Sequence, residues 1–252
     1  MRIKKILIPI ISAIFLITVI CVSLSAFTVK EVNVSFSTFV KQDGAQDIQE
    51  SLNKYNGKNL LFIKTDRIIN EIEEDPYFKV SSIKKDFPNV LKISIEERKE
   101  VFVIEYKNKE YFADCEGRIL SKVKGDDYHN CLYVQFKNVD VEDITVGEKI
   151  ESDDINVIST ALDIVYKNAN FGSVKTVLIE KVFDGDNHIN LTFNTYSSVE
   201  IVVYKAERSG AEKTAKAFEL YNQENNDYRK SNNKIIAHDL DGEEDFKVVW
   251  SE

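Results

Sequence analysis

The sequence predicts an α+β protein with a single N-terminal transmembrane helix, a small β-α-α-β-β module and a larger mixed β domain with flanking helices. Three observations predict this class. A long uncharged run follows a basic N-terminus, helical and strand periodicities then alternate over about 70 residues, and strand-like alternation dominates the remainder. The predicted boundaries are 1–5 for a cytoplasmic N-terminus, 6–27 for the transmembrane helix, 28–98 for the small module, 99–240 for the β domain, and 241–252 for a C-terminal strand and tail.

The predicted anchor extends from Ile6 through Phe15 to Phe27, a run of 22 residues without a charge. As a helix it would be about 33 Å long, which matches the hydrocarbon thickness of a bilayer. The basic residues that precede it, Arg2, Lys4 and Lys5, orient the N-terminus toward the cytoplasm. A cleaved signal peptide is the alternative, with small residues at Ser23 and Ser25. Signal peptides have apolar regions of about 7–15 residues, so the longer run favours a retained anchor.

Net charge excludes one class of partner. The chain has 252 residues and a formal net charge of −9. Without the three N-terminal basic residues, 30 basic and 42 acidic side chains remain, which leaves −12. Such a surface repels the phosphates of nucleic acids and anionic lipid head groups. We therefore expect no nucleic acid partner.

The small module begins with a strand near 29–35 and continues with a helix on which Ile48, Leu52 and Tyr55 share one face. Gly57 ends this helix, because glycine readily adopts the left-handed conformation found after a helix. After the apolar connector 60–63, a second helix is expected to begin with Thr65 as its N-cap. Its buried face is Ile68, Ile69 and Ile72, and it ends before Pro76.

Two strands complete the module. The first, near 78–85, alternates irregularly around Ser81–Ser82. The turn 87–89 leads to the second, in which Leu91, Ile93 and Ile95 alternate with polar residues, as expected of a half-buried strand. The pattern predicts a small sheet with two helices packed on one face.

Four segments of this region are similar to one known family. They are Gly57–Ile63 (GKNLLFI), Asp75–Val80 (DPYFKV), Phe87–Arg98 (FPNVLKISIEER) and Tyr111–Leu120 (YFADCEGRIL). The first three resemble the POTRA domain of the bacterial cell-division proteins FtsQ and DivIB, and the fourth resembles the hairpin that opens the β domain of that family. Glu100 and Ser35 stand where the family usually has Pro and Gly, which changes local turn chemistry but not the core pattern.

The region after residue 100 is predicted to be rich in strands. Alternating runs occur near 132–136, 189–193 and 199–203. Helical patterns interrupt them near 153–168 and 211–221, and in the second of these Ala211, Ala215 and Phe218 share one face.

The candidate site lies at the C-terminus. Lys234–Leu240 and Phe246–Trp250 resemble the last strands of the FtsQ-type β domain, of which the terminal strand lies at a sheet edge and docks single-pass division proteins. The expected docking residues are Phe246, Val248 and Trp250 on one face, with Ile235, Ile236 and Asp239. An edge strand has unpaired N–H and C=O groups to which a partner segment can add. The alternative is that the three C-terminal side chains close the core of this domain itself. If they dock a partner, a charge at Val248 or Trp250 should abolish binding without unfolding.

No catalytic or metal chemistry is predicted. The acidic clusters lack the glycine and ligand spacing of a calcium loop, and the histidines and cysteines lack zinc spacing. We expect no cofactor, no metal and no small-molecule substrate. Cys115 and Cys131 either form a disulfide or remain two half-buried thiols.

The resemblance implies a non-catalytic scaffold of the division septum, anchored in the cell membrane with its folded domains outside. The implied partners are other single-pass division proteins, similar to FtsB/DivIC and to FtsL, and the implied role is to recruit or regulate septal peptidoglycan synthesis. Two alternatives remain: an anchored enzyme that acts on cell-wall polymer, and a secreted binding protein released by cleavage near Ser25.

Overall fold

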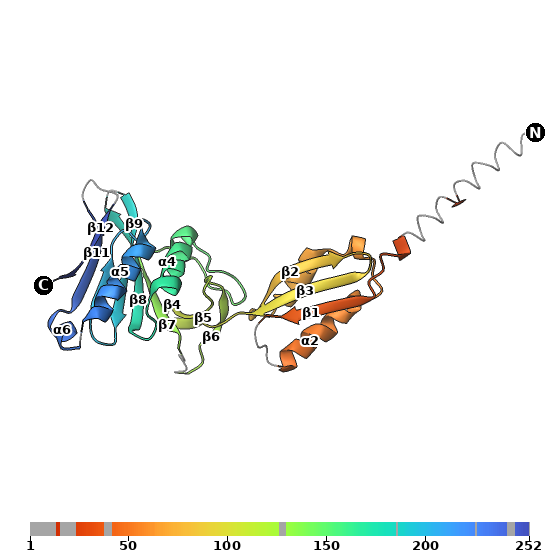
Figure 1. Cartoon of the computed structure of the whole chain (residues 1–252), viewed down its shortest axis with the longest axis horizontal. Coiled ribbons are helices and arrows are strands. Elements are labelled where there is room, and N and C mark those ends of the chain that lie inside the picture. Colours follow the sequence, from red (N-terminus) through yellow and green to blue (C-terminus); the bar gives the residue numbers. More distant parts are fainter. Residues whose placement is uncertain are drawn as a thin grey trace, which may run out of the picture. The chain divides into compact units, whose positions relative to one another are not determined.

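The computed structural model describes residues 14–15, 24–37, 42–125, 130–184, 186–224, 226–240 and 245–251. The chain divides into two units, Met1–Arg98 and Lys99–Glu252, each with its own sheet and its own hydrophobic core (Figure 1).

Most of the predicted anchor, including Ile6, lies outside the described residues. Phe15 belongs to a short helical piece and is 70% exposed. Phe27 lies in a turn, where its ring packs edge-on against Phe87 with 5.8 Å between the centroids. Within the ranges given above, no helix combines the length and the apolar character needed to cross a membrane.

The first unit has the predicted β-α-α-β-β order. Its elements are β1 (Glu31–Phe36), α2 (Gln42–Leu52), α3 (Thr65–Ile72), β2 (Phe78–Asp86) and β3 (Val90–Glu97), with 3-10 turns at Asn53–Tyr55 and Leu60–Phe62. The helix α3 begins at Thr65 as expected, but Lys64 is its N-cap and caps it without a side-chain hydrogen bond. Gly57 has a φ of +78°, which agrees with its predicted role after the preceding helical turn.

The sheet of this unit has the order β1-β3-β2, with β1 and β3 parallel and β2 and β3 antiparallel. Because β3 is central, its alternating residues Leu91, Ile93 and Ile95 are all buried against residues of both helices. The irregular alternation in β2 coincides with a shift of register between Val80 and Ser82.

The second unit is built on a larger sheet. Its elements are β4 (Phe102–Tyr106), β5 (Lys109–Ala113), β6 (Ile119–Lys122), β7 (Leu132–Lys137), α4 (Ile155–Asn168), β8 (Val174–Asp184), β9 (Asp186–Thr195), β10 (Glu200–Val203), α5 (Gly210–Gln223), α6 (Asn226–Ser231), β11 (Lys234–Asp239) and β12 (Phe246–Ser251). The nine strands have the order β12-β11-β10-β9-β8-β7-β4-β5-β6.

The helices of the second unit lie in the connections between parallel strands. β7 pairs with β8, and β10 with β11, in parallel. Parallel neighbours need a long crossover, commonly a helix. The helix α4 supplies the first crossover, and α5 with α6 supplies the second. Figure 1 shows α4 and α5 beside the sheet of this unit, and both helices contribute side chains to its core.

The buried face of α5 differs from the one expected. Ala215 is exposed, and the buried residues are Gly210, Lys213, Thr214, Ala217, Phe218 and Tyr221. The expected face was therefore displaced around the helix, because a lysine and a threonine occupy positions that a hydrophobicity pattern assigns to solvent.

Candidate functional site

The predicted docking strand β12 is an end strand of the nine-stranded sheet. It pairs antiparallel with β11, so that Trp250 lies opposite Ile235, Val248 opposite Ala237 and Phe246 opposite Asp239. Within the part of the chain that the structure describes, no strand pairs with its outer side.

The hydrogen-bond pattern decides which backbone groups of β12 point outward. The Leu240 N–H donates to the Asp245 carbonyl at 3.1 Å at the start of the hairpin. In an antiparallel pair, residues that face each other alternate between hydrogen-bonded and non-hydrogen-bonded pairs. Counting from Leu240, the hydrogen-bonded positions of β12 are 247, 249 and 251. The N–H and C=O groups of Phe246, Val248 and Trp250 therefore point away from β11.

The other side of β11 supports the same assignment. The Tyr204 N–H donates to the Ala237 carbonyl at 2.9 Å, and the Glu200 N–H donates to the Asn233 carbonyl at 2.7 Å. Odd-numbered positions of β11 thus face β10, which leaves even-numbered positions for β12. One such position is Ile236, which lies opposite Val249.

The side chains of Val248 and Trp250 pack against the core of their own unit. Trp250 also meets Tyr228 of α6 edge-on, with 5.3 Å between the ring centroids. Their cross-strand partners Ile235 and Ala237 are fully buried. A charge at Val248 or Trp250 would enter the edge of the core, so we now expect it to lower the stability of the fold as well. Its effect on folding and on binding stays a prediction.

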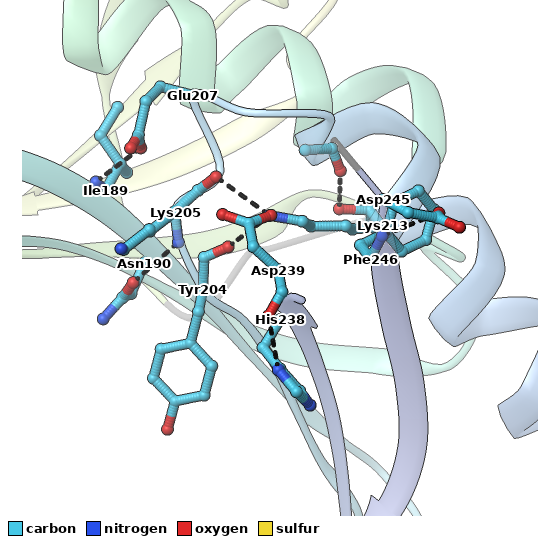
Figure 2. A network of polar contacts seen from close by, with 12 residues as sticks. Ile189, Asn190, Tyr204, Lys205, Glu207, Lys213, His238, Asp239, Asp245 and Phe246 are labelled. Carbon is cyan, nitrogen blue, oxygen red and sulfur yellow. Dashed lines mark hydrogen bonds and ion pairs between the residues drawn. The ribbon is translucent and has the colours of Figure 1, made fainter. Parts of the chain in front are cut away.

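A buried ion pair holds the end of β11 to α5 (Figure 2). The Lys213 side chain is fully buried and forms an ion pair with Asp239. Its ammonium also donates to the carbonyl oxygens of Tyr204 at 3.0 Å and Lys205 at 3.4 Å. An ammonium has three N–H donors, so these three acceptors satisfy it.

The segment after β10 that supplies two of these acceptors is held in turn by polar contacts. The Asn190 side-chain oxygen accepts from the Lys205 N–H at 3.1 Å, and the Glu207 carboxylate accepts from the Ile189 N–H at 2.9 Å (Figure 2). The network lies at the end of β11, where Asp239 pairs with Phe246 at the start of β12.

Sequence reasoning singled out Asp239 but missed Lys213. The signal was present, because Gly210, Lys213, Ala217 and Tyr221 repeat at helical spacing and would have placed the lysine on the buried face. A buried lysine needs a partner such as a carboxylate, because an unpaired charge is costly to bury.

The remaining candidates for chemistry give no site. Cys115 and Cys131 are half-buried thiols. Burial, with a smaller contribution from the charge of Glu100, raises the pKa of the Cys131 thiol to about 11, so it stays protonated and unreactive at neutral pH. Over the described ranges, no group of three or more His, Cys, Asp or Glu side chains is placed to hold a metal ion.

Comparison with known proteins gives one family match and two informative relatives. Residues 27–98 match the model of the FtsQ-type POTRA domain. Over 138 residues the chain is 26% identical to the cell division protein DivIB of Clostridium acetobutylicum, covering 55% of this chain and 53% of that protein. Over 135 residues it is 29% identical to DivIB of Clostridium tetani, covering 54% of this chain and 49% of that protein. The chain thus matches about half the length of these relatives.

Proposed function

We propose that the chain is a non-catalytic, membrane-anchored division scaffold of the FtsQ/DivIB family, a proposal supported by the match to the FtsQ-type POTRA domain and by the similarity to two DivIB proteins. Its folded units would lie outside the cell and bind other single-pass division proteins, similar to FtsB/DivIC and FtsL. Through them it would help to recruit or regulate septal peptidoglycan synthesis. Tethering to one membrane supports such binding, because it raises the effective concentration of each partner.

The observation that carries the proposal is the outer side of β12, with which no strand of the described residues pairs. Three residues, Phe246, Val248 and Trp250, direct their N–H and C=O groups to that side. An extended segment of a partner can therefore add to the sheet as a tenth strand through backbone hydrogen bonds. In this mode the backbone edge, rather than the side chains of Val248 and Trp250 that pack against the core, makes the first contact with the partner.

The test removes a single outward N–H. Proline at position 248 lacks the donor and places its ring in the path of an added strand, yet it leaves the hydrogen bonds from β12 to β11 in place. Val248→Ala is the matched control, because it loses side-chain packing and keeps the N–H. Both variants and the wild type are expressed in native cells, extracted from the membrane and purified with their partners.

We expect the wild type and Val248→Ala to retain single-pass division proteins and Val248→Pro to lose them. Thermal unfolding of the two variants should agree closely, which shows that both are folded. Equal recovery by Val248→Pro and Val248→Ala would disprove docking by strand addition at β12. Recovery of no division protein by the wild type would argue against the scaffold role itself.

A further inference from the structure

Among the described residues of the first unit, three large apolar side chains outside the predicted anchor are exposed. Leu61 is 41% exposed, Phe62 is 71% exposed and Phe87 is 53% exposed. We call these three residues the entry patch. Leu61 and Phe62 lie in the 3-10 turn at 60–62, and Phe87 lies in the turn between β2 and β3.

The entry patch surrounds the point at which the chain enters the domain. The Leu60 N–H donates to the Phe27 carbonyl at 2.7 Å, and the Asn59 side-chain amide donates to the Leu24 carbonyl at 2.7 Å. The ring of Phe27 packs against that of Phe87. The last residues of the 22-residue uncharged run are therefore fixed to the same loops that expose Leu61, Phe62 and Phe87.

Basic side chains accompany this patch, although the chain as a whole is acidic. The Lys85 ammonium donates to the Leu61 carbonyl at 3.4 Å. Lys58 and Lys64 are exposed at the two ends of the same loop. Aromatic and aliphatic side chains edged by lysines are characteristic of protein surfaces that lie at the boundary between acyl chains and head groups.

We propose that the entry patch inserts into the outer-leaflet interface of the phospholipid bilayer and holds the first unit against the membrane. The inference rests on the proposed membrane anchoring, because a run that crosses the bilayer and ends at Phe27 brings the attached loops to its surface. The lysines then lie at the level of the lipid phosphates. The first unit then contacts the membrane in two ways: through the chain that connects it to the anchor, and through the entry patch.

The test measures the depth of single tryptophans in the full-length chain. Trp250 is the only tryptophan, so Trp250→Phe supplies a silent background. Into it we introduce Phe62→Trp, the positive reference Phe15→Trp, and the control Glu74→Trp. Glu74 is exposed and precedes β2, whose nine residues separate it from the entry patch by about 27 Å. Each protein is reconstituted into vesicles of phosphatidylcholine and phosphatidylglycerol. Acyl chains brominated near the glycerol backbone report on Phe62→Trp and Glu74→Trp, and chains brominated near their ends report on Phe15→Trp, which lies near the middle of the predicted span.

We expect the brominated lipid to quench Phe62→Trp several-fold more than Glu74→Trp, with blue-shifted emission. If Phe62→Trp is quenched no more than Glu74→Trp while Phe15→Trp is strongly quenched, the anchor stands and the insertion of the patch is disproved. If Phe15→Trp is not quenched either, the anchor and the patch contact both fail. Blue-shifted emission without lipid quenching would assign the patch to a protein partner and overturn the proposal.

Discussion

The two end strands of the nine-stranded sheet, β6 and β12, differ in what lies along their outer sides. At β6, the segment 147–150 runs beside residues 117–119. The Ile119 N–H donates to the Glu148 carbonyl at 2.9 Å, and the Gly147 N–H donates to the Ile119 carbonyl at 2.9 Å. Ile150 of this segment is buried in the core. At β12, no comparable segment pairs with the outer side within the described residues.

The difference is that a chain segment covers the outer side of β6 at Ile119, whereas among the described residues no segment pairs with the outer side of β12. An exposed edge favours unwanted pairing, so natural proteins usually blunt or cover it. The covering segment 147–150 continues to Asp154 at the start of α4. The Asp154 carboxylate accepts from the Lys181 ammonium at 2.6 Å and from the Asp140 N–H at 3.1 Å, and so tethers the chain beyond the segment. An edge left open in the same sheet is what docking by strand addition requires.

The largest loss of stability is expected when the buried charge of Lys213, beside the end of β11, is removed. Lys213→Met leaves the Asp239 carboxylate and the carbonyls of Tyr204 and Lys205 without their donor, which should lower the free energy of unfolding by about 3–5 kcal/mol. Urea unfolding of the purified chain measures it. Lys216→Met on the same helix breaks an exposed pair with Glu219 and should cost at most about 1 kcal/mol. Similar losses in both variants would contradict the structural role of Lys213.

A somewhat smaller effect is expected at the covered edge. Ile150 is only 2% exposed, so Ile150→Ala should lower the free energy of unfolding by about 2–4 kcal/mol. It should also loosen the segment over β6 and promote self-association through the uncovered strand. Light scattering and urea unfolding measure the two effects. Val146→Ala, at a position in the same segment that is 41% exposed, is the control and should leave both nearly unchanged.

The tether of the covering segment should respond to pH. Burial alone would raise the pKa of the Asp154 carboxyl, but the hydrogen bonds from Lys181 and from the Asp140 N–H outweigh burial and lower the pKa below its usual 3.8. The ionised carboxylate therefore stabilises the fold above that value, and its contribution is lost as pH falls through the lowered pKa.

Asp154→Asn should accordingly cost about 1.5–3 kcal/mol at neutral pH. The difference from wild type should shrink in acid, which urea unfolding at a series of pH values measures. Asp163→Asn breaks an exposed pair with Lys167 four residues away and should cost about 0.5 kcal/mol or less. A loss for Asp154→Asn that does not change with pH would show that its charge is not what tethers the segment.

The last comparison of the two edges uses the unmodified protein and measures hydrogen exchange at one amide on each edge. The Ile119 N–H is bonded to the covering segment, whereas the Val248 N–H points outward from β12. Hydrogen exchange followed by NMR should find the Val248 amide exchanging roughly tenfold or more faster than the Ile119 amide. Equal protection of both amides in the isolated protein would mean that the β12 edge is already covered.

The local elements of the first unit could be predicted well from the sequence. Leu91, Ile93 and Ile95 alternate because one face of β3 is buried, and α3 begins at Thr65 as its sequence indicates. In the second unit, the runs near 132–136, 189–193 and 199–203 correspond to β7, β9 and β10. These predictions succeed because periods of two and 3.6 residues follow from backbone geometry alone.

The location of the candidate site could be predicted from the sequence, but the role of its side chains could not. The sequence, through a family resemblance, indicated a C-terminal edge strand with Phe246, Val248 and Trp250 on one face. It left open whether those side chains meet a partner or the protein itself. The structure places Val248 and Trp250 against the core, so the exposed chemistry of the strand lies in its backbone.

By itself, then, the sequence determined the class of the fold, the local periodicity of its elements and the similarity of residues 27–98 to the FtsQ-type POTRA domain. Only the tertiary structure decided which strands end the sheet, which edge is covered, and that Lys213 is buried against Asp239. The reason is physical. A strand's two faces are set by its own residues, whereas its neighbours are set by contacts between segments far apart, such as Ile119 with Glu148.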